Sequence, residues 1–275
     1  MRLYFSSLKV TAFGFLGLSV SLCGASKIVR TEDMHAFQEM TENAGPHSLV
    51  IFDINETILL ANEPIFQSLH KYQRLALQYE LEETYSKDVV HQFWGYLRLQ
   101  TRRELIDPGV VDIIKSLQAR NVKVIALTTS GMGPLNKDLS LEDWKLDILK
   151  GFRVDFSKAF PEKPCLYFKY LPTKHPDRYP GFKEGILFTC GLSKGLLLSL
   201  FLKALDYKPD AIFFVDDKLK NLLAVEEVCK KLNISFVGCH YTAFTQKDLK
   251  PLDKKKIYQE FEAFLKQTES NPPAV

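Results

Sequence analysis

The chain has 275 residues and a formal net charge of +3, from 36 lysines and arginines against 33 aspartates and glutamates. A chain of this length can bury a substantial core and fits one domain with insertions. Its nearly balanced, interspersed charges exclude a basic nucleic-acid-binding surface, and the block Lys254-Lys255-Lys256 is typical of the solvent side of a helix.

Residues 1–26 predict a secretory signal peptide. The charged residues of this segment are all basic, an apolar run covers Val10–Leu22, and small residues lead to a cleavage site after Ala25 or Ser26. The run is too short for a comfortable membrane span. We therefore expect export, to the periplasm or as a secreted protein, with no stable membrane span in the mature chain. An uncleaved N-terminal anchor is the alternative.

Four cysteines follow the predicted signal peptide: Cys165, Cys190, Cys229 and Cys239. Export would permit disulfides, but the cysteine spacing matches neither a metal knuckle nor a redox CxxC motif. The apolar surroundings of Cys190 and Cys229 are typical of buried small hydrophobic residues. The pairing of the four stays open.

Strand-like and helix-like segments alternate along the mature chain, which predicts an α/β fold around a parallel sheet. A buried strand at 49–52 comes first. Apolar residues then recur at helical spacing over roughly 62–105, with a break near 82–86. The two halves of this stretch predict a pair of amphipathic helices packed back to back.

The remaining elements alternate in the same way, apart from one long segment. Residues 132–185 contain a predicted helix near 140–150 and are then rich in proline, lysine and aromatic residues, as expected of an inserted subdomain or a long ordered loop. The other predictions are a helix at 108–121, strands at 122–127, 186–189, 211–215 and 234–237, and helices from Ser193, at 219–232 and at 253–267.

Polar residues stand where these strands end. The carboxyl ends of parallel strands meet at one edge of a sheet, so these side chains should converge on one crevice. Carboxylates with water suit Mg²⁺, while a hydroxyl and an ammonium group can hold a phosphoryl group. The candidate residues are Asp53, Thr128 (with Thr129 as the alternative), Lys194, Asp216 and Asp217.

These motifs resemble those of the haloacid dehalogenase (HAD) superfamily, whose phosphatases use four short motifs in this order. The family's D-x-D-x-T is similar to residues 53–57, except that Asn55 replaces the second aspartate. The resemblance covers residues 48–240 and implies a Rossmannoid parallel sheet with helices on both faces. Similar chains form an exported branch in intracellular bacteria. The other three motifs correspond to Thr128, Lys194 and Asp216-Asp217.

The resemblance also implies a domain plan. One HAD-like domain would cover residues 27–270, followed by a loose tail at 271–275. A helical cap and a second insertion would interrupt its core. The core segments are 27–57, 108–131 and 186–270, the cap is 58–107, and the second insertion is 132–185.

The resemblance assigns Asp53 as the nucleophile and a Mg²⁺ ligand, with Asn55 ligating through its backbone carbonyl. Asp216 and Asp217 would complete the metal shell. Thr128 and Lys194 would contact the phosphate. In the active phosphatases the second acid protonates the leaving oxygen, which an amide cannot do because it does not titrate. Such acid–base catalysis contributes about 10² to 10⁴ in rate.

Two functions therefore stay open. The first is an exported, Mg²⁺-dependent phosphohydrolase that acts on a small phosphoester through an aspartyl-phosphate intermediate and is slowed by Asn55. The alternative is a catalytically degenerate HAD-fold protein that binds a phosphorylated ligand or a protein partner, or serves in the envelope. Glu63 and His70 are weaker candidates for a substitute proton donor, and His240, which follows a predicted strand, could reach the crevice. Taken singly, Asp53 and the Asp216-Asp217 pair could also be helix caps.

Overall fold

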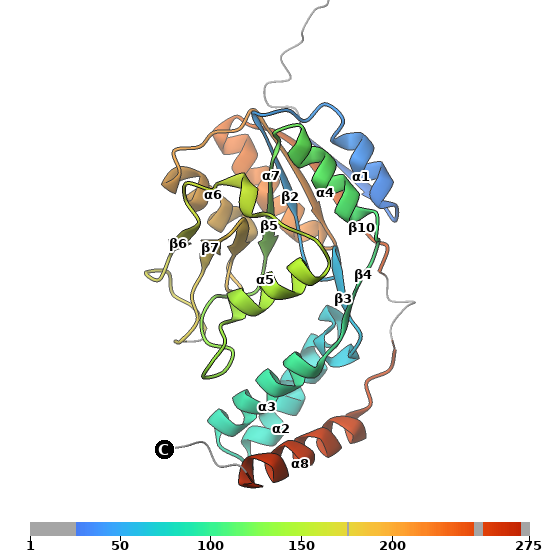
Figure 1. Cartoon of the computed structure of the whole chain (residues 1–275), viewed down its shortest axis with the longest axis vertical. Coiled ribbons are helices and arrows are strands. Elements are labelled where there is room, and N and C mark those ends of the chain that lie inside the picture. Colours follow the sequence, from blue (N-terminus) through green and yellow to red (C-terminus); the bar gives the residue numbers. More distant parts are fainter. Residues whose placement is uncertain (1–25, 175, 245–249, 271–275) are drawn as a thin grey trace, which may run out of the picture.

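The computed structural model describes residues 26–174, 176–244 and 250–270, so the predicted signal sequence before Ser26 and the tail at 271–275 lie outside it (Figure 1). Its centre is an eight-stranded sheet in the order β1-β10-β9-β2-β5-β8-β7-β6. The first six strands in this order are parallel, whereas the last two pairings, β8 with β7 and β7 with β6, are antiparallel. The strands are β1 Ser26–Thr31, β2 Ser48–Phe52, β5 Lys123–Thr128, β6 Cys165–Tyr167, β7 Gly181–Lys183, β8 Ile186–Phe188, β9 Ala211–Asp216 and β10 Ser235–Tyr241.

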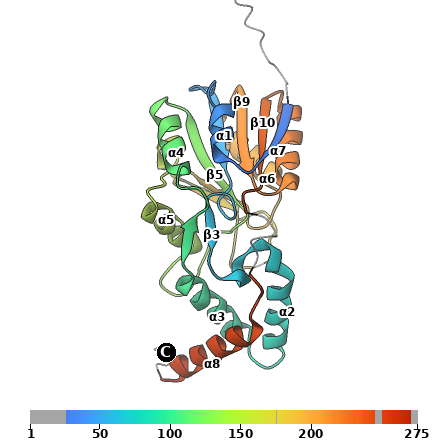
Figure 2. The ribbon, with the colours of Figure 1, turned by 90° about the vertical axis from the view of Figure 1, so that its right-hand side faces the viewer.

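Helices cover both faces of this sheet (Figure 2). Side chains alternate along β2, so Val50 and Phe52 pack in the cluster beneath α1, α4 and α5, whereas Leu49 and Ile51 pack beneath α6 and α7. The mostly parallel α/β fold predicted from the sequence is confirmed at this level. The five helices are α1 Met34–Met40, α4 Val110–Ala119, α5 Leu141–Gly151, α6 Lys194–Ala204 and α7 Leu219–Leu232.

A helical unit projects from the carboxyl edge of the sheet on a two-stranded antiparallel ribbon, β3 Leu59–Ala61 and β4 Arg103–Leu105. The prediction of helix over 62–105 is wrong at both ends. Extended backbone at Gln67 separates the first 3₁₀ turn from the second, which leads directly into the first α-helix at Lys71. Extended backbone at Thr101 ends the second α-helix. The unit contains η1 Pro64–Phe66, η2 Ser68–His70, α2 Lys71–Glu82 and α3 Lys87–Gln100.

The last helix, α8 Lys254–Ser270, completes the helical unit instead of covering the sheet (Figure 2). Its buried residues Phe261 and Phe264 pack against Phe93 of α3. Their ring centroids lie 4.9 Å and 5.8 Å, respectively, from that of Phe93. The domain plan expected from the sequence assigned this helix to the core. An amphipathic pattern shows that one face of a helix is buried, but it does not show which element that face packs against.

Much of the segment 132–185 belongs to the central sheet and its covering layer. Strands β6 and β7 extend the sheet beyond β8, and α5 covers one face. The two-residue turn between β7 and β8 has positive φ at Glu184 (44°) and Gly185 (83°), as in the tight turns that suit the twist of a hairpin. The sequence predicted neither strand, since three-residue strands carry almost no periodic signal.

Two further features concern cysteines and membrane spans. All four described cysteines are free; Cys229 and Cys239 are buried, whereas Cys165 and Cys190 are half-buried. The expectation of a buried Cys190 is therefore only partly met.

Among the described residues, no helix has the length and apolar character needed to span a membrane.

Candidate functional site

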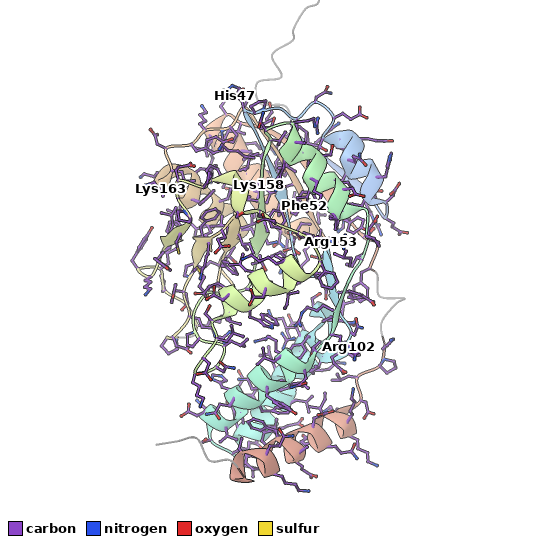
Figure 3. The ribbon with its side chains drawn as sticks, viewed as in Figure 1. His47, Phe52, Arg102, Arg153, Lys158 and Lys163 are labelled. Atoms are coloured by element: carbon purple, nitrogen blue, oxygen red, sulfur yellow. The ribbon has the colours of Figure 1, made fainter. Side chains whose placement is uncertain are left out.

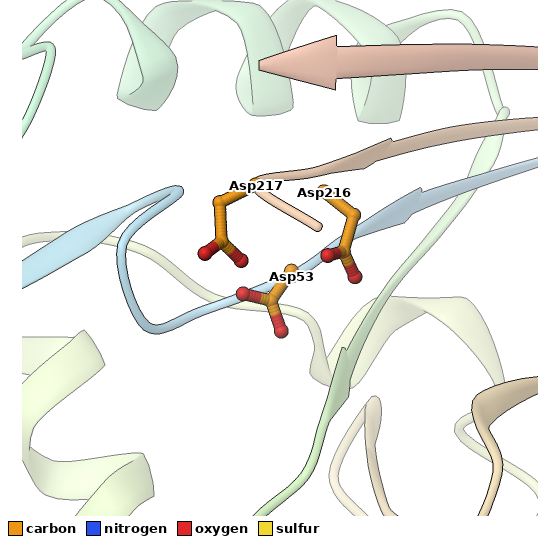
Figure 4. Close-up of side chains that lie close together, drawn as sticks. All are labelled: Asp53, Asp216 and Asp217. Carbon is orange, nitrogen blue, oxygen red and sulfur yellow. The ribbon is translucent and has the colours of Figure 1, made fainter. Parts of the chain in front are cut away.

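Three carboxylates meet at the carboxyl edge of the sheet (Figure 4). Asp53 follows β2, and its backbone amide donates to the carbonyl of Val215 on the neighbouring strand β9 at 2.9 Å. Asp216 is the last residue of β9, and Asp217 follows it. One oxygen from each carboxylate lies within 4.8 Å of the others, so the structure brings these three predicted residues together.

Lys194 joins two of these carboxylates from the first turn of α6. Its ammonium group donates to Asp53 Oδ1 and, at 2.6 Å, to Asp216 Oδ2, and its side chain is 1% exposed. Burial lowers the pKa of Lys194, but the charges of Asp53 and Asp216 more than offset this and raise it overall. The ammonium group therefore stays charged and neutralises part of the cluster.

Asp216 is fully buried and has hydrogen bonds on both oxygens. In addition to Lys194, the backbone amide of Lys218 donates to Oδ1 at 2.8 Å, and Asn221 Nδ2 lies 2.9 and 3.0 Å from the two oxygens. The sequence did not single out Lys218 or Asn221, although both lie within five residues of Asp216. Together these donors fix the orientation of the carboxylate.

Only one of the two carboxylate oxygens of Asp217 has a hydrogen-bond partner among the described residues. Its Oδ2 accepts from Lys218 Nζ at 2.7 Å, whereas its buried Oδ1 has no hydrogen-bond partner among the described residues. Burial raises the pKa of Asp217 to about 8, and Asp53 adds to this while Lys218 opposes it. Burial likewise raises the pKa of Asp53 to about 6, against the opposing charge of Lys194. Oxygen atoms of this kind are the ligands that Mg²⁺ takes, so the donor set fits a divalent cation.

Asn55 has a partner that the sequence did not indicate. Its side-chain oxygen accepts a hydrogen bond from Lys145 Nζ of α5 at 3.1 Å, and Lys145 is 3% exposed. Burial lowers the pKa of Lys145 to about 7, reinforced by Arg103 and Arg98 and opposed by Asp53. A lysine amine therefore lies beside the position where the resemblance leads one to expect an acid.

Thr128 lies at the same sheet edge, but its hydroxyl is engaged by its own loop. The residue is fully buried at the end of β5, between β2 and β8, and the hydroxyl accepts from the Ser130 amide at 3.3 Å. The alternative residue, Thr129, is exposed. Another threonine, Thr57, reaches the cluster and lies 3.4 Å from Asp53 Oδ2.

The weaker candidates for a proton donor are engaged elsewhere or contact only the backbone. Glu63 pairs with Lys256 of α8 at 2.9 Å. His70 contacts Gln73, at 2.7 Å, and a backbone carbonyl near α8. His240 does approach the cluster, with Nε2 3.1 Å from the carbonyl oxygen of Asp217.

Two of the proteins that this chain is similar to have names that refer to the bacterial envelope. A "Putative outer membrane protein" of Chlamydia trachomatis serovar D is 25% identical over 232 residues, which cover 83% of this chain and 82% of that protein. A relative from Chlamydia pneumoniae, also named as such, is 26% identical over 219 residues, 76% of each chain. These names suggest an envelope or exported protein.

Other relatives come from Rickettsia. An uncharacterized protein of Rickettsia prowazekii is 24% identical over 228 residues, 82% of this chain and 81% of that protein. Matches to proteins of Rickettsia bellii and Rickettsia felis cover 51% and 48% of those chains, about half their length. The family described as "Protein of unknown function (DUF2608)" matches residues 30–271. Because that match spans nearly all of the described residues, the chain belongs to the DUF2608 family.

Proposed function

We propose that this protein is an exported envelope protein with a HAD-like site that binds Mg²⁺ together with a phosphate monoester. The observation that carries the proposal is the buried, unpartnered Oδ1 of Asp217 beside Asp53 and Asp216. A buried oxygen without a partner costs about 1–3 kcal/mol. A divalent cation would give this oxygen a bond and offset the clustered negative charge.

On this proposal, different residues of the site would bind the cation and the phosphate. Asp53, Asp217 and the backbone carbonyl of Asn55 would hold the cation, with Asp216 supporting it from its fixed position. Lys194, already charged and buried, would contact the phosphate together with Thr128. In this arrangement Mg²⁺ would supply positive charge to the phosphate oxygens.

Two observations favour binding over rapid turnover. The first is that the Chlamydia relatives are named as putative outer membrane proteins, which is a location in the envelope and not an enzymatic activity. Asn55, moreover, has no titratable proton, and its side-chain oxygen is occupied by Lys145. A ligand-binding role in the envelope needs no proton donor at this position.

The test is a thermal melt of the mature protein with Mg²⁺ and inorganic phosphate. At one hundred times the dissociation constant, bound ligand adds about 2.7 kcal/mol, or roughly 5 to 10 °C in melting temperature. The Asp217→Asn variant should lose most of this shift. Asp147→Asn, which changes an exposed carboxylate on α5, should retain it. An equal shift in all three proteins would contradict the proposal.

Slow phosphoester hydrolysis is the second candidate, favoured by the setting of Asp53. Its carboxylate is buried and held by Lys194 and Thr57 at the end of a strand. An oxygen of Asp53 would form a bond to phosphorus while the ester bond breaks and the leaving oxygen takes a proton from water. Water would then hydrolyse the aspartyl phosphate, releasing phosphate and restoring Asp53.

An Asn55→Asp variant tests this second candidate. The new carboxyl would supply the missing proton donor, so Mg²⁺-dependent phosphate release from p-nitrophenyl phosphate should rise by about 10² to 10⁴. Asp53→Asn should abolish release in the same background. Release that survives the loss of Asp53 would rule out the aspartyl-phosphate route.

A further inference from the structure

A group of cations lies next to the carboxylate cluster, between the helical unit and α5. We call Arg98 of α3, Arg103 of β4 and Lys145 of α5 the cation group. The Arg103 guanidinium carbon is 4.4 Å from the centroid of the Trp144 ring, and Lys145 Nζ is 5.1 Å from the same centroid. Arg103 Nη1 also lies 3.5 Å from the backbone carbonyl oxygen of Arg98, and the Arg98 guanidinium carbon lies 5.3 Å from the centroid of the Phe66 ring. The charges of Arg103 and Arg98 both lower the pKa of Lys145, so the three residues act electrostatically as one group.

These cations have no counter-charge of their own. Among the described residues, none of the three forms an ion pair. The polar contacts of Arg103 and Lys145 are oxygens of neutral groups, as in the 2.8 Å bond from Arg103 to the Thr101 carbonyl, and Arg98 lies over the Phe66 ring. Lys194 and Lys218, in contrast, each pair with two carboxylates.

The lack of a counter-charge is costly because the group is shielded from water. Lys145 is 3% exposed, and Arg98 and Arg103 are half-buried. Burial, then Arg178, Arg74 and Arg103, lower the pKa of Arg98 to about 9. A buried charge without a partner costs free energy, and like charges that face one another add to the cost. An anion bound among them would remove both penalties.

We propose that Arg98, Arg103 and Lys145 bind a second anionic group of the ligand whose phosphate lies at Lys194 and the carboxylate cluster. This inference rests on the proposed Mg²⁺ and phosphate site. Lys145 connects the two regions, because it contacts Asn55, two residues beyond Asp53. The ligand class is therefore a phosphate monoester that carries a second carboxylate or phosphate.

A purely structural role for the same cations predicts a different outcome. If Lys145 served only to hold α5 against the sheet edge, Lys145→Met would lower the melting temperature of the ligand-free protein. On the present proposal, the substitution removes a buried amine whose charged form burial and the neighbouring arginines disfavour, and it keeps much of the side-chain volume. It should therefore raise the melting temperature while weakening ligand binding.

Calorimetric titration of the mature protein with excess Mg²⁺ tests the proposal directly. Two matched pairs of probes serve: 3-phosphoglycerate against glycerol 3-phosphate, and fructose 1,6-bisphosphate against fructose 6-phosphate. The first pair tests a carboxylate as the second anion, and the other tests a phosphate. In at least one pair the doubly anionic probe should bind about ten-fold more tightly or better, as expected for a charge-assisted contact.

Arg103→Met should remove this preference, and Arg103→Lys should retain part of it. Arg102→Met is the matched control, because Arg102 is the adjacent, exposed arginine (Figure 3), and it should leave the preference unchanged. Inorganic phosphate should bind the wild type and all three variants alike. A melting curve for each variant verifies that it is folded.

The outcomes separate this inference from the proposed function. If inorganic phosphate binds but neither doubly anionic probe binds more tightly than its partner, the inference is overturned and the proposed site stands. A preference that persists in folded Arg103→Met and Lys145→Met also overturns it. If neither phosphate nor any probe binds in the presence of Mg²⁺, the proposed function and the inference both fail.

Discussion

Lys194 offsets the repulsion between the buried carboxylates at the strand ends. It contacts both Asp53 and Asp216, and all three side chains are almost completely buried. Lys194→Met would leave the two carboxylates facing each other without a cation. Removing one partner from a buried ion pair costs about 3–5 kcal/mol. Urea denaturation should show a loss of this size.

The control for this substitution is Lys203→Met, which changes an exposed lysine in the last turn of the same helix. Only a few tenths of a kcal/mol are expected there, from the weaker interaction with the helix dipole. Equal losses in the two variants would show that Lys194 does not neutralise the cluster in the folded protein.

The sequence predicted the grouping of Asp53, Asp216 and Asp217 because the α/β pattern shows where the strands end, and the carboxyl ends of parallel strands meet at one edge of the sheet. It could not predict Lys145. Lys145 and Lys150 lie on the same predicted helix, and only the packing of α5 makes one buried and the other exposed. The direction of the Thr128 hydroxyl was equally inaccessible, since it depends on the loop that follows.

At the level of elements, the close approach of α6 and α7 positions Lys194. A Cβ atom on Gly195 would lie 2.1 Å from the carbonyl oxygen of Ala224 in α7, so only glycine fits without movement. Gly195→Ala should force the helices apart and cost about 1–3 kcal/mol. Thermal melting provides the measurement.

Gly151→Ala is the matched control for that substitution, because a Cβ atom there would meet nothing within 4 Å at the end of α5. We expect it to be neutral or stabilising by up to about 1 kcal/mol, given the better helix propensity of alanine. A cost for Gly151→Ala equal to that for Gly195→Ala would contradict the packing argument.

The packing of α8 on the helical unit makes a second prediction at this scale. Phe261 is 2% exposed and contacts Phe93 and Tyr85 edge to face. Phe261→Ala should cost about 3–5 kcal/mol, whereas Gln259→Ala on the exposed side of the helix should change little. Chemical denaturation of both variants would decide whether α8 stabilises this unit.

The helices and the central strands were largely predictable, since each is long enough to show its period. The edge strands were not. The β3–β4 ribbon and strands β6 and β7 have three residues each, and β1 pairs only with the distant strand β10. Pairing between strands that are distant in the sequence depends on packing in the assembled sheet, so the local sequence gives little indication of it.

For the whole molecule, the predicted export can be tested by mass spectrometry of the mature protein. Ser26 opens β1, and its hydroxyl donates to Glu226 of α7 at 2.5 Å. Cleavage after Ala25 would retain this contact, so we expect a mature chain that begins at Ser26. Leu16→Arg, which interrupts the apolar run, should leave the leader attached and the protein in the cytoplasmic fraction. An unprocessed wild-type chain in the envelope fraction would favour the uncleaved anchor.

The pairing of β1 with β10 would set the order of events during the predicted export. Ser26 is matched with Phe236, so the first segment to emerge from a translocation pore needs one of the last. The sheet cannot close its outer edge until almost the entire polypeptide has crossed. Contacts between such distant segments slow folding and leave apolar surface uncovered meanwhile. On the predicted export route, the outer edge of the sheet would therefore stay open until the strand at Ser235–Tyr241 has crossed the membrane.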